Sequence, residues 1–452
     1  MQLQAGIADS WQIQNAGKSY VFYLNRKTRF SNGKICSAYD VMYSFQRLRD
    51  TSLASPGAWI FENRLDSIKG FELIDSFTFA IHLKEAFAPF LSILSTSYCG
   101  IVCSGTEKNG IPIGSGPFQV QSWERDGYLI LEKNTYYAKT DAQGKSLPYL
   151  DRVVISTLSE GATEFLAFLD GKIDMILDID ASFKDIIFTP HNTLQAHFQE
   201  YMKLETSQFL NTEYIGIYAE AENAPDIIAN TAFRRAMAYA LPKSDFVFTI
   251  LKGKGSAASG GLIPAAFPGF DSAQYGIPYD PAQAKAILDS LRKEGIVQTQ
   301  AIPMSVPPTY AIWAESFQSA WKAVGIQVSI DIQPNAVIRT GMREGKLCMF
   351  RASWIADYPD PENYASLFVS TIGAPPNYTR FANPEVDALY TQAVQNQENR
   401  NQLYRKLDSI AIQSATIMPI VYDKAWRFVS KRVRNAQPDR LNRIIMEHIQ
   451  LQ

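Results

Sequence analysis

Cysteine and histidine are scarce in this sequence. Four cysteines (residues 36, 99, 103 and 348) and four histidines occur among 452 residues, and the histidines are widely scattered. Structural metal sites need such residues at short, fixed spacings, so the pattern predicts no metal and no cofactor. Cys99 and Cys103 could form a local bridge if the backbone at Gly100 bends. They also fit two small buried apolar side chains, and we favour that interpretation.

Long apolar runs and an excess of charge of one sign are also missing. No run reaches the ~18 apolar residues that a helix needs to cross a bilayer. The net charge is −2, so no basic field attracts nucleic acid, and we expect no nucleic-acid partner. The chain opens without the basic and apolar regions of a secretory signal, which taken literally indicates the cytoplasm, although a sequence shortened at its start fits equally well.

The composition is that of a folded protein with more than one domain. Apolar residues make up 46% and charged residues 19% of the chain, and 452 residues predict two or three domains. Aromatic residues make up 12%. Tyr and Trp offer flat amphipathic surfaces at low entropic cost, so this share favours a binding protein, although most rings could equally belong to the core.

An acidic and aromatic loop follows a short apolar segment in the last third of the chain. Residues 347–354 predict a buried strand, and Pro359 and Pro361 prevent its continuation because proline lacks a backbone donor. The loop carries three carboxylates: Asp357, Asp360 and Glu362. Open α/β sheets hold their ligands at strand ends, and Asp357, the acid nearest the strand, could receive an ammonium group.

Other interpretations of these residues stay open or find less support. The loop also fits an Asp-Pro turn whose side chains cap their own backbone. Its acids could form the carboxylate pair of a glycosidase, but such acids usually come from separate elements. The segment 114–116 is not the Gly-x-Ser-x-Gly elbow of a hydrolase. A phosphate-binding loop at 113–118 would need a following helix, whereas strands at 118–123 and 128–133 predict a hairpin.

The remaining pattern alternates between helices and strands. Ser37 and Asp40 resemble a capping box for a helix that reaches residue 48, and Thr231 is predicted to cap a helix over 232–241. Two βαβ units are predicted, at 153–177 and at 302–332, with Gly325 ending the helix of the second. Residues 253–281 are rich in Gly and Pro and are expected to lie across a surface or a cleft. These features predict two α/β lobes with a ligand-binding cleft between them.

Seven segments match, in the expected order, the motifs of a known protein family. The match runs nearly end to end. The segments are residues 8–11 with 18–24 (LAxSW…YTFxLR), 30–33 with 37–41 (FxDG…TAxDV), 114–118 with 131–137 (GTGPF…LERNPxYW), 233–241 (VRQALAYAID), 279–285 (YDPxKAK), 325–328 and 354–361. In these segments the chain resembles the peptide-type solute-binding proteins of ABC importers, which are family 5 of the extracellular solute-binding proteins.

The resemblance implies an α/β fold: a two-lobed periplasmic-binding-protein-like clamshell of type II with an additional small α/β subdomain. The subdomain is expected at 1–112 and attached to the first lobe. The first lobe is expected at 113–215, with 425–452 returning to it, and the second lobe at 216–424. The acid at the position of Asp357 pairs with the peptide ammonium in this family. The expected ligand-binding residues are Asp357, Trp354, Tyr358, Asn377, Tyr378 and Tyr218.

The implied function is non-enzymatic: an extracytoplasmic binder, acting as a monomer, captures a peptide and delivers it to the permease subunits of an ABC importer. It is expected in the periplasm or anchored to the membrane on its extracytoplasmic side, although the chain carries no export signal or lipid-anchor cysteine. The family's earliest strand is also missing, and Tyr218 stands where the family often has asparagine. Alternatives are an oligosaccharide, a metal chelate or haem in the same clamshell, a hydrolase, or a ligand-free structural or signalling descendant.

Overall fold

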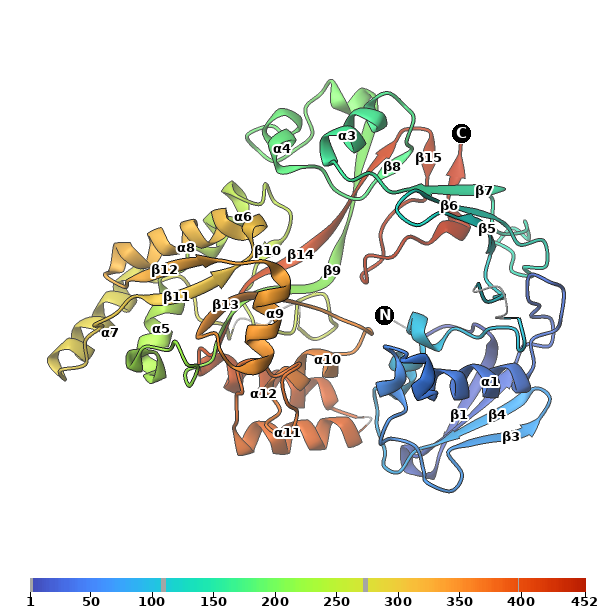
Figure 1. Ribbon diagram of the computed structural model, residues 1–452, viewed down its shortest axis with the longest axis horizontal. Helices are drawn as coiled ribbons and strands as arrows, with labels where there is room; N and C mark the ends of the chain where they lie inside the picture. The colour runs from blue at the N-terminus through green and yellow to red at the C-terminus, as the bar shows by residue number, and fades with distance from the viewer. Residues whose placement is uncertain (1–2, 107–110, 271–274, 397) are drawn as a thin grey trace. The chain divides into compact units, whose positions relative to one another are not determined.

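The computed structural model describes residues 3–106, 111–270, 275–396 and 398–452 (Figure 1). The chain forms two compact units. The first contains Met1–Thr206, Trp426–Asp439 and Arg443–Gln452, and the second contains Ser207–Ala425 and Arg440–Asn442. The predicted three-part division at 112, 215 and 424 is finer than these two units and stays a prediction.

A four-stranded antiparallel sheet opens the first unit. Its order is β1 (Ala8–Gln14), β2 (Ser19–Leu24), β4 (Thr78–His82) and β3 (Phe71–Asp75). Helix α1 (Ala38–Arg49) packs on this sheet, where the Phe45 ring lies 5.0–5.9 Å from the rings of Phe61, Phe71 and Phe79. The predicted capping box is confirmed, since Asp40 accepts a bond from the backbone N–H of Ser37 at 3.0 Å.

The rest of the first unit contains smaller sheets and short helices. The predicted hairpin is confirmed as β5 (Phe118–Trp123) and β6 (Tyr128–Lys133), and β7 (Arg152–Ser156) pairs with β6. The predicted parallel βαβ unit at 153–177 is wrong: β7 belongs to this antiparallel sheet, while β8 (Met175–Ile176) pairs antiparallel with another strand. Alternation alone does not reveal a strand's partner. The remaining elements are α2 (Phe90–Leu94), α3 (Gly161–Leu169), α4 (Ala181–Ile187), β15 (Val433–Arg434) and β16 (Gln450–Leu451).

The second unit is organised around a mixed sheet. The strand order is β10 (Ser256–Ala257), β14 (Ile417–Ser430), β9 (Met202–Ile217), β13 (Met349–Ile355), β11 (Ile302–Val306) and β12 (Val328–Ile332), and β8 also pairs with β14. The predicted βαβ unit at 302–332 is confirmed, because β11 and β12 are parallel and α8 (Ala311–Val324) connects them. Gly325 ends α8 with φ at 92°, a conformation that suits glycine. β13 is parallel to β11 and antiparallel to β9.

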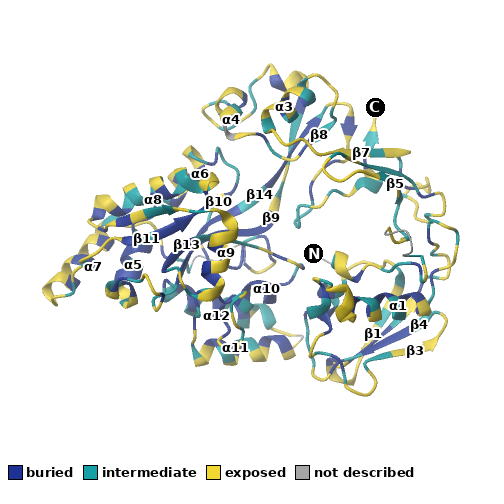
Figure 2. Cartoon of the chain, viewed as in Figure 1, coloured by how far each residue is buried: buried dark blue, intermediate teal, exposed yellow. Residues whose placement is uncertain are grey.

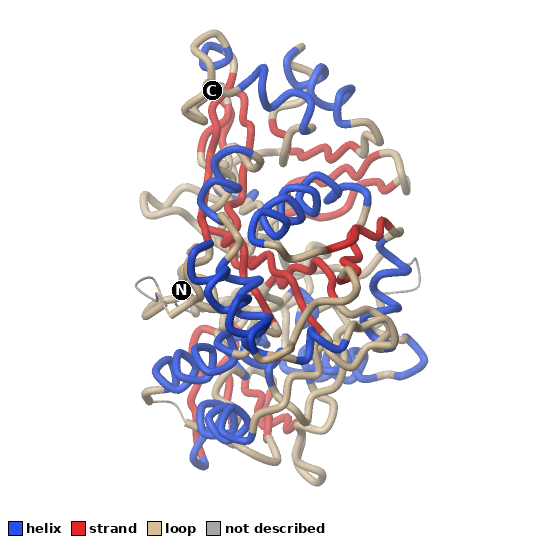
Figure 3. The backbone as a smooth tube through the Cα atoms, turned by 90° about the vertical axis from the view of Figure 1, so that its left-hand side faces the viewer, coloured by secondary structure: helices blue, strands red, loops and turns tan. Residues whose placement is uncertain are grey.

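Helices cover both faces of this sheet (Figure 3). Ile215 and Met349 pack in one apolar cluster with side chains of α5 (Thr231–Tyr239), α7 (Pro281–Lys293) and α8, whereas their neighbours Tyr214 and Phe350 pack in another. The second cluster contains side chains of α9 (Asn335–Glu344), α10 (Glu362–Ala365), α11 (Pro384–Gln395) and α12 (Arg400–Gln413). Adjacent strand residues therefore belong to opposite cores, as the period of two requires, and Figure 2 shows these strands buried.

One local prediction is corrected in the second unit, and another is partly met. Helix α5 begins at Thr231 and is capped by Asn230, whose Oδ1 accepts a bond from Phe233 N at 3.1 Å, one residue before the predicted cap. Residues 253–281 were expected to lie across a surface or a cleft, and their described part combines exposed residues such as Tyr279 with buried apolar side chains such as Leu262 and Phe267. Residues 271–274 of this segment lie outside the described part.

Candidate ligand-binding site

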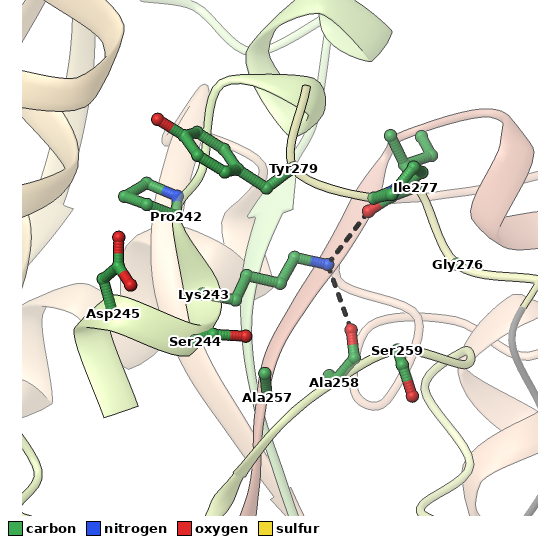
Figure 4. Close-up of a pocket in the computed structure, with 11 residues that line it drawn as sticks. Pro242, Lys243, Ser244, Asp245, Ala257, Ala258, Ser259, Gly276, Ile277 and Tyr279 are labelled. Atoms are coloured by element: carbon green, nitrogen blue, oxygen red, sulfur yellow. Dashed lines mark hydrogen bonds between the residues drawn. The ribbon is translucent and has the colours of Figure 1, made fainter. Parts of the chain in front are cut away.

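One cavity of about 340 Å³ lies in the second unit beside a buried lysine (Figure 4). Lys243, at the start of α6 (Lys243–Thr249), is 7% exposed. Its Nζ donates bonds to the carbonyl oxygens of Ala258 at 3.2 Å and Ile277 at 3.4 Å. No carboxylate within the described ranges pairs with this ammonium group, and burial lowers the pKa of Lys243 to about 8. Lys243 thus joins two loops at the rim of the cavity.

The Lys243→Met variant tests this account through the pH dependence of stability. The unfolded chain keeps the ammonium proton up to a pKa of about 10.5, whereas the folded protein releases it near pH 8. Between these values the unfolded state binds more protons, so the free energy of unfolding gains roughly 3 kcal/mol from this group as pH rises. Urea denaturation at pH 7.5 to 10 should show this gain in the wild type relative to Lys243→Met. The control Lys322→Met, at an exposed lysine, should show the same pH dependence as the wild type. If the free energy of unfolding changes equally with pH in all three proteins, the account is wrong.

The predicted acidic loop lies at the end of β13, and its three acids have different environments. Asp360 is 4% exposed and accepts two bonds of 2.7 Å from the guanidinium of Arg400. Glu362 is 3% exposed and accepts a bond from Tyr390 at 2.5 Å and another from Tyr358. Asp357 is exposed and has no cationic partner in the described part of the chain. The acids therefore do not form a glycosidase-type pair, and Asp357 alone is open to a ligand.

Asn363 connects Asp357 to Trp354. The Oδ1 atom of Asn363 accepts bonds from Trp354 Nε1 at 2.9 Å and from the backbone N–H of Asp357 at 3.2 Å. Its Nδ2 donates to the Asp357 carboxylate at 3.4 Å. Although residue 357 is exposed, the protein around its carboxylate removes enough water to raise the pKa of Asp357, while the bond from Asn363 acts in the opposite direction. Asn363 was not among the predicted site residues, and its only sequence signal is its place in this loop.

Two of the other predicted site residues, Tyr218 and Tyr378, belong to a different region. Tyr218 follows β9 next to the first residue of β13, whereas Asp357 follows the last. Seven residues of β13 separate these ends, which is about 20 Å at 3.3 Å per residue. Arg380 links Tyr218 to Tyr378. Its guanidinium lies 4.5 Å from the centroid of the Tyr218 ring and donates a hydrogen bond of 2.7 Å to the backbone carbonyl of Tyr378.

Tyr358 and Asn377 have internal roles in the loop structure. Tyr358 is 3% exposed and donates its hydroxyl to Glu362. Asn377 is 2% exposed, and its amide donates to the carbonyls of Val369 and Phe381 while accepting from Phe381 N at 3.0 Å. Neither side chain presents an open polar group to a ligand in this conformation.

A second polar cluster lies between β9 and its neighbouring strands. Asn211 donates to Glu213 at 3.1 Å and to Asp423 at 3.2 Å, and Glu213 also pairs with Arg351. Burial and the nearby Asp423 raise the pKa of Glu213, which Arg351 opposes. Among the described residues, the buried atoms Asn211 Oδ1 and Arg351 Nε have no hydrogen-bond partner. The unsatisfied acceptor lies near the strand end that carries Asp357, because Asn211 pairs with Ile355, and the unsatisfied donor belongs to Arg351, which joins the same cluster through Glu213.

Within residues 3–106, 111–270, 275–396 and 398–452, no group of three or more His, Cys, Asp and Glu side chains could hold a metal ion. None of the helices described has the length and apolar character of a membrane span.

Comparison with known proteins places the chain in a family. The profile of the bacterial extracellular solute-binding proteins, family 5, matches residues 2–375. Heme-binding protein A of Haemophilus influenzae is 27% identical, over 96% of this chain and 81% of that protein. The dipeptide-binding protein of Escherichia coli is 24% identical, over 99% of this chain and 86% of that protein.

Solved structures share the fold. The periplasmic binding protein DppA of Helicobacter pylori, in complex with the peptide STSA, matches with a TM-score of 0.78 and 21% identity, over 100% of this chain and 90% of that chain. HbpA2 of Haemophilus parasuis matches with a TM-score of 0.80 and 22% identity, over 100% of this chain and 91% of that chain. These matches confirm the predicted α/β fold of a two-lobed periplasmic binding protein. With a profile match over most of its length, the chain belongs to the bacterial extracellular solute-binding proteins of family 5.

Proposed function

We propose that this protein binds a short peptide through its free amino end at Asp357 and delivers it to the permease subunits of an ABC importer. The observation that carries this proposal is the difference among the three acids of one loop. Asp360 and Glu362 have protein partners, whereas Asp357 is exposed and held in place by Asn363. An oriented carboxylate without a cation is suited to receive an ammonium group in a charge-assisted hydrogen bond.

The unsatisfied atoms near the same strand end support a peptide over an apolar solute. A peptide backbone offers N–H and C=O groups, which could satisfy Asn211 Oδ1 and Arg351 Nε once neighbouring side chains move and open these buried atoms. Bridging waters could also make these bonds, so that side chains of different peptides are accommodated. The partly buried Trp354 ring adds an apolar surface next to Asp357.

The six predicted site residues take different roles in this proposal. Asp357 and Trp354 contact the amino end of the peptide. Tyr378 and Tyr218, joined by Arg380, form a separate contact region at the other end of β13. Tyr358 and Asn377 support the loops instead of touching the ligand, because their polar groups are occupied.

Relatives support the same solute class and a transport role without catalysis. Curated relatives from Escherichia coli and Pseudomonas aeruginosa are named dipeptide- or di/tripeptide-binding proteins. We place the protein on the extracytoplasmic side of the membrane, as a monomer. Haem, suggested by the name of the Haemophilus influenzae relative, finds less support at Asp357. Residues 207–425 contain no histidine, which is a common axial ligand of haem iron.

Calorimetric titration of the purified protein with Ala-Ala and Ala-Ala-Ala tests the proposal. We expect saturable binding of at least one of these peptides, and much weaker binding of the same peptide after N-acetylation, which removes the ammonium group. An absorbance spectrum of the purified protein serves as the control for haem. Haem absorbance together with no heat from either peptide would overturn the peptide assignment.

A further inference from the structure

Cys36 and Cys103 share one small buried cluster in the first unit, although they are 67 positions apart in the chain. Each is 1% exposed, and both pack with Phe30. Asn32 also reaches this cluster, with its Nδ2 at 3.6 Å from Cys103 Sγ. The two sulfur atoms therefore occupy the same small volume of the protein interior.

The backbone that follows each cysteine is tied to the same carboxylate. Asp40 Oδ2 accepts a bond from Ser37 N at 3.0 Å, and Asp40 Oδ1 accepts one from Ser104 N at 3.2 Å. Since both oxygen atoms belong to one carboxylate, residues 37 and 104 are held next to each other. Lys34 reinforces the arrangement, because its Nζ donates to Asp40 at 2.9 Å and to Ser104 at 3.0 Å. A disulfide requires such close backbones, with Cα atoms about 4.4–6.8 Å apart.

Neither of the other cysteines belongs to this cluster. Cys99 directs its Sγ to the carbonyl of Ile93 at 3.9 Å. Cys348 lies in the apolar core of the second unit. The structure thus favours one pairing of the four cysteines over the local bridge between Cys99 and Cys103 that their spacing permits.

We propose that Cys36 and Cys103 form a disulfide bond when the protein folds in an oxidising compartment. The oxidant is a second disulfide: a thiolate of one cysteine attacks it and releases one thiol, and the other cysteine then displaces the second thiol. The protein loses two protons and two electrons, and the oxidant is reduced to two thiols. In cells the reaction depends on the extracytoplasmic placement of the family, whereas the pairing is independent of which solute is bound.

The folded, reduced protein is expected to react slowly. Burial raises the pKa of Cys36 to about 12, with Asp40 and Cys103 adding to the effect, so little thiolate is present near neutral pH. The bond should therefore form during folding, before the cluster closes.

Peptide mapping of the full chain tests the pairing directly. The protein is unfolded and reduced, refolded with a mixture of reduced and oxidised glutathione, alkylated and digested without reductant. We expect a linked peptide pair containing Cys36 and Cys103, with Cys99 and Cys348 alkylated. A linked Cys99–Cys103 pair, or four alkylated cysteines after refolding, would overturn the proposal.

Thermal unfolding provides a second, independent measurement. A cross-link that closes a loop of this length restricts the unfolded chain, so the refolded protein should melt about 5 °C or more higher without reductant than with it. Cys36→Ala and Cys103→Ala should lose this difference, while the matched variant Cys99→Ala should keep it. If reductant lowers the melting temperature of Cys36→Ala as much as that of the wild type, the pairing is wrong.

Discussion

Replacing Asp357 by asparagine is expected to weaken the binding of a free dipeptide by roughly thirtyfold to several thousandfold. Removing one partner of a hydrogen-bonded charge pair typically costs about 2–5 kcal/mol, and each 1.4 kcal/mol is a factor of ten. The variant keeps the shape of the side chain and removes only its charge. Because the protein around its carboxylate raises the pKa of Asp357 in the free protein, the loss of this charge should not destabilise the fold. Calorimetric titration with Ala-Ala measures the change.

Two controls separate a lost charge pair from a general defect. Asp226→Asn makes the same chemical change at an exposed acid elsewhere in the second unit, and should bind as the wild type does. N-acetylated Ala-Ala lacks the ammonium group, so Asp357→Asn should affect its weak binding little. If Asp357→Asn binds free Ala-Ala with wild-type affinity, Asp357 does not contact the ligand.

The pH dependence of binding gives the same residue a further readout. The ammonium of the peptide pairs with the ionised carboxylate, and the pKa of Asp357 lies above its usual value. Affinity should therefore fall as pH decreases through this raised pKa, and this fall should be missing in Asp357→Asn.

Replacing Asp360 by asparagine is expected to destabilise the protein by about 3–5 kcal/mol, although the residue is only three positions from Asp357. The substitution leaves the guanidinium of Arg400 buried without its carboxylate, which is the costly way to break a buried ion pair. The substitution also weakens a second hydrogen bond, because Asp360 Oδ1 accepts from the backbone N–H of Glu362 at 3.0 Å. Urea denaturation of the wild type and the variant measures the difference.

The Asp357→Asn variant is the matched control for this experiment, because it makes the same change in the same loop and should stay within about 0.5 kcal/mol of the wild type. The double variant Asp360→Asn, Arg400→Met removes both charges and should recover part of the loss. Equal stability of the two single Asp→Asn variants would show that the pair with Arg400 contributes little.

Local structure was largely predictable because its causes are close in sequence. The capping box of α1 depends on Ser37 and Asp40, three positions apart, and the turn of Gly325 depends on one residue. β11 and β12 occupy the predicted residues 302–306 and 328–332, since their apolar periodicity is strong. The partners of β7 and β8 were not predictable. β7 pairs with β6 and β8 pairs with β14, and such partners depend on the whole sheet.

By itself, the sequence determined the family, the alternation of helices and strands, and the loop that carries Asp357. Short-range periodicity, capping and turn chemistry act over a few residues, and they leave a readable pattern. Only the tertiary structure decided which of the loop's acids is open, because the partner of Asp360 is Arg400, forty positions away. It likewise brought Cys36 beside Cys103 and separated Tyr218 from Asp357. Such choices depend on contacts between distant segments, which form only when the chain packs into its folded units.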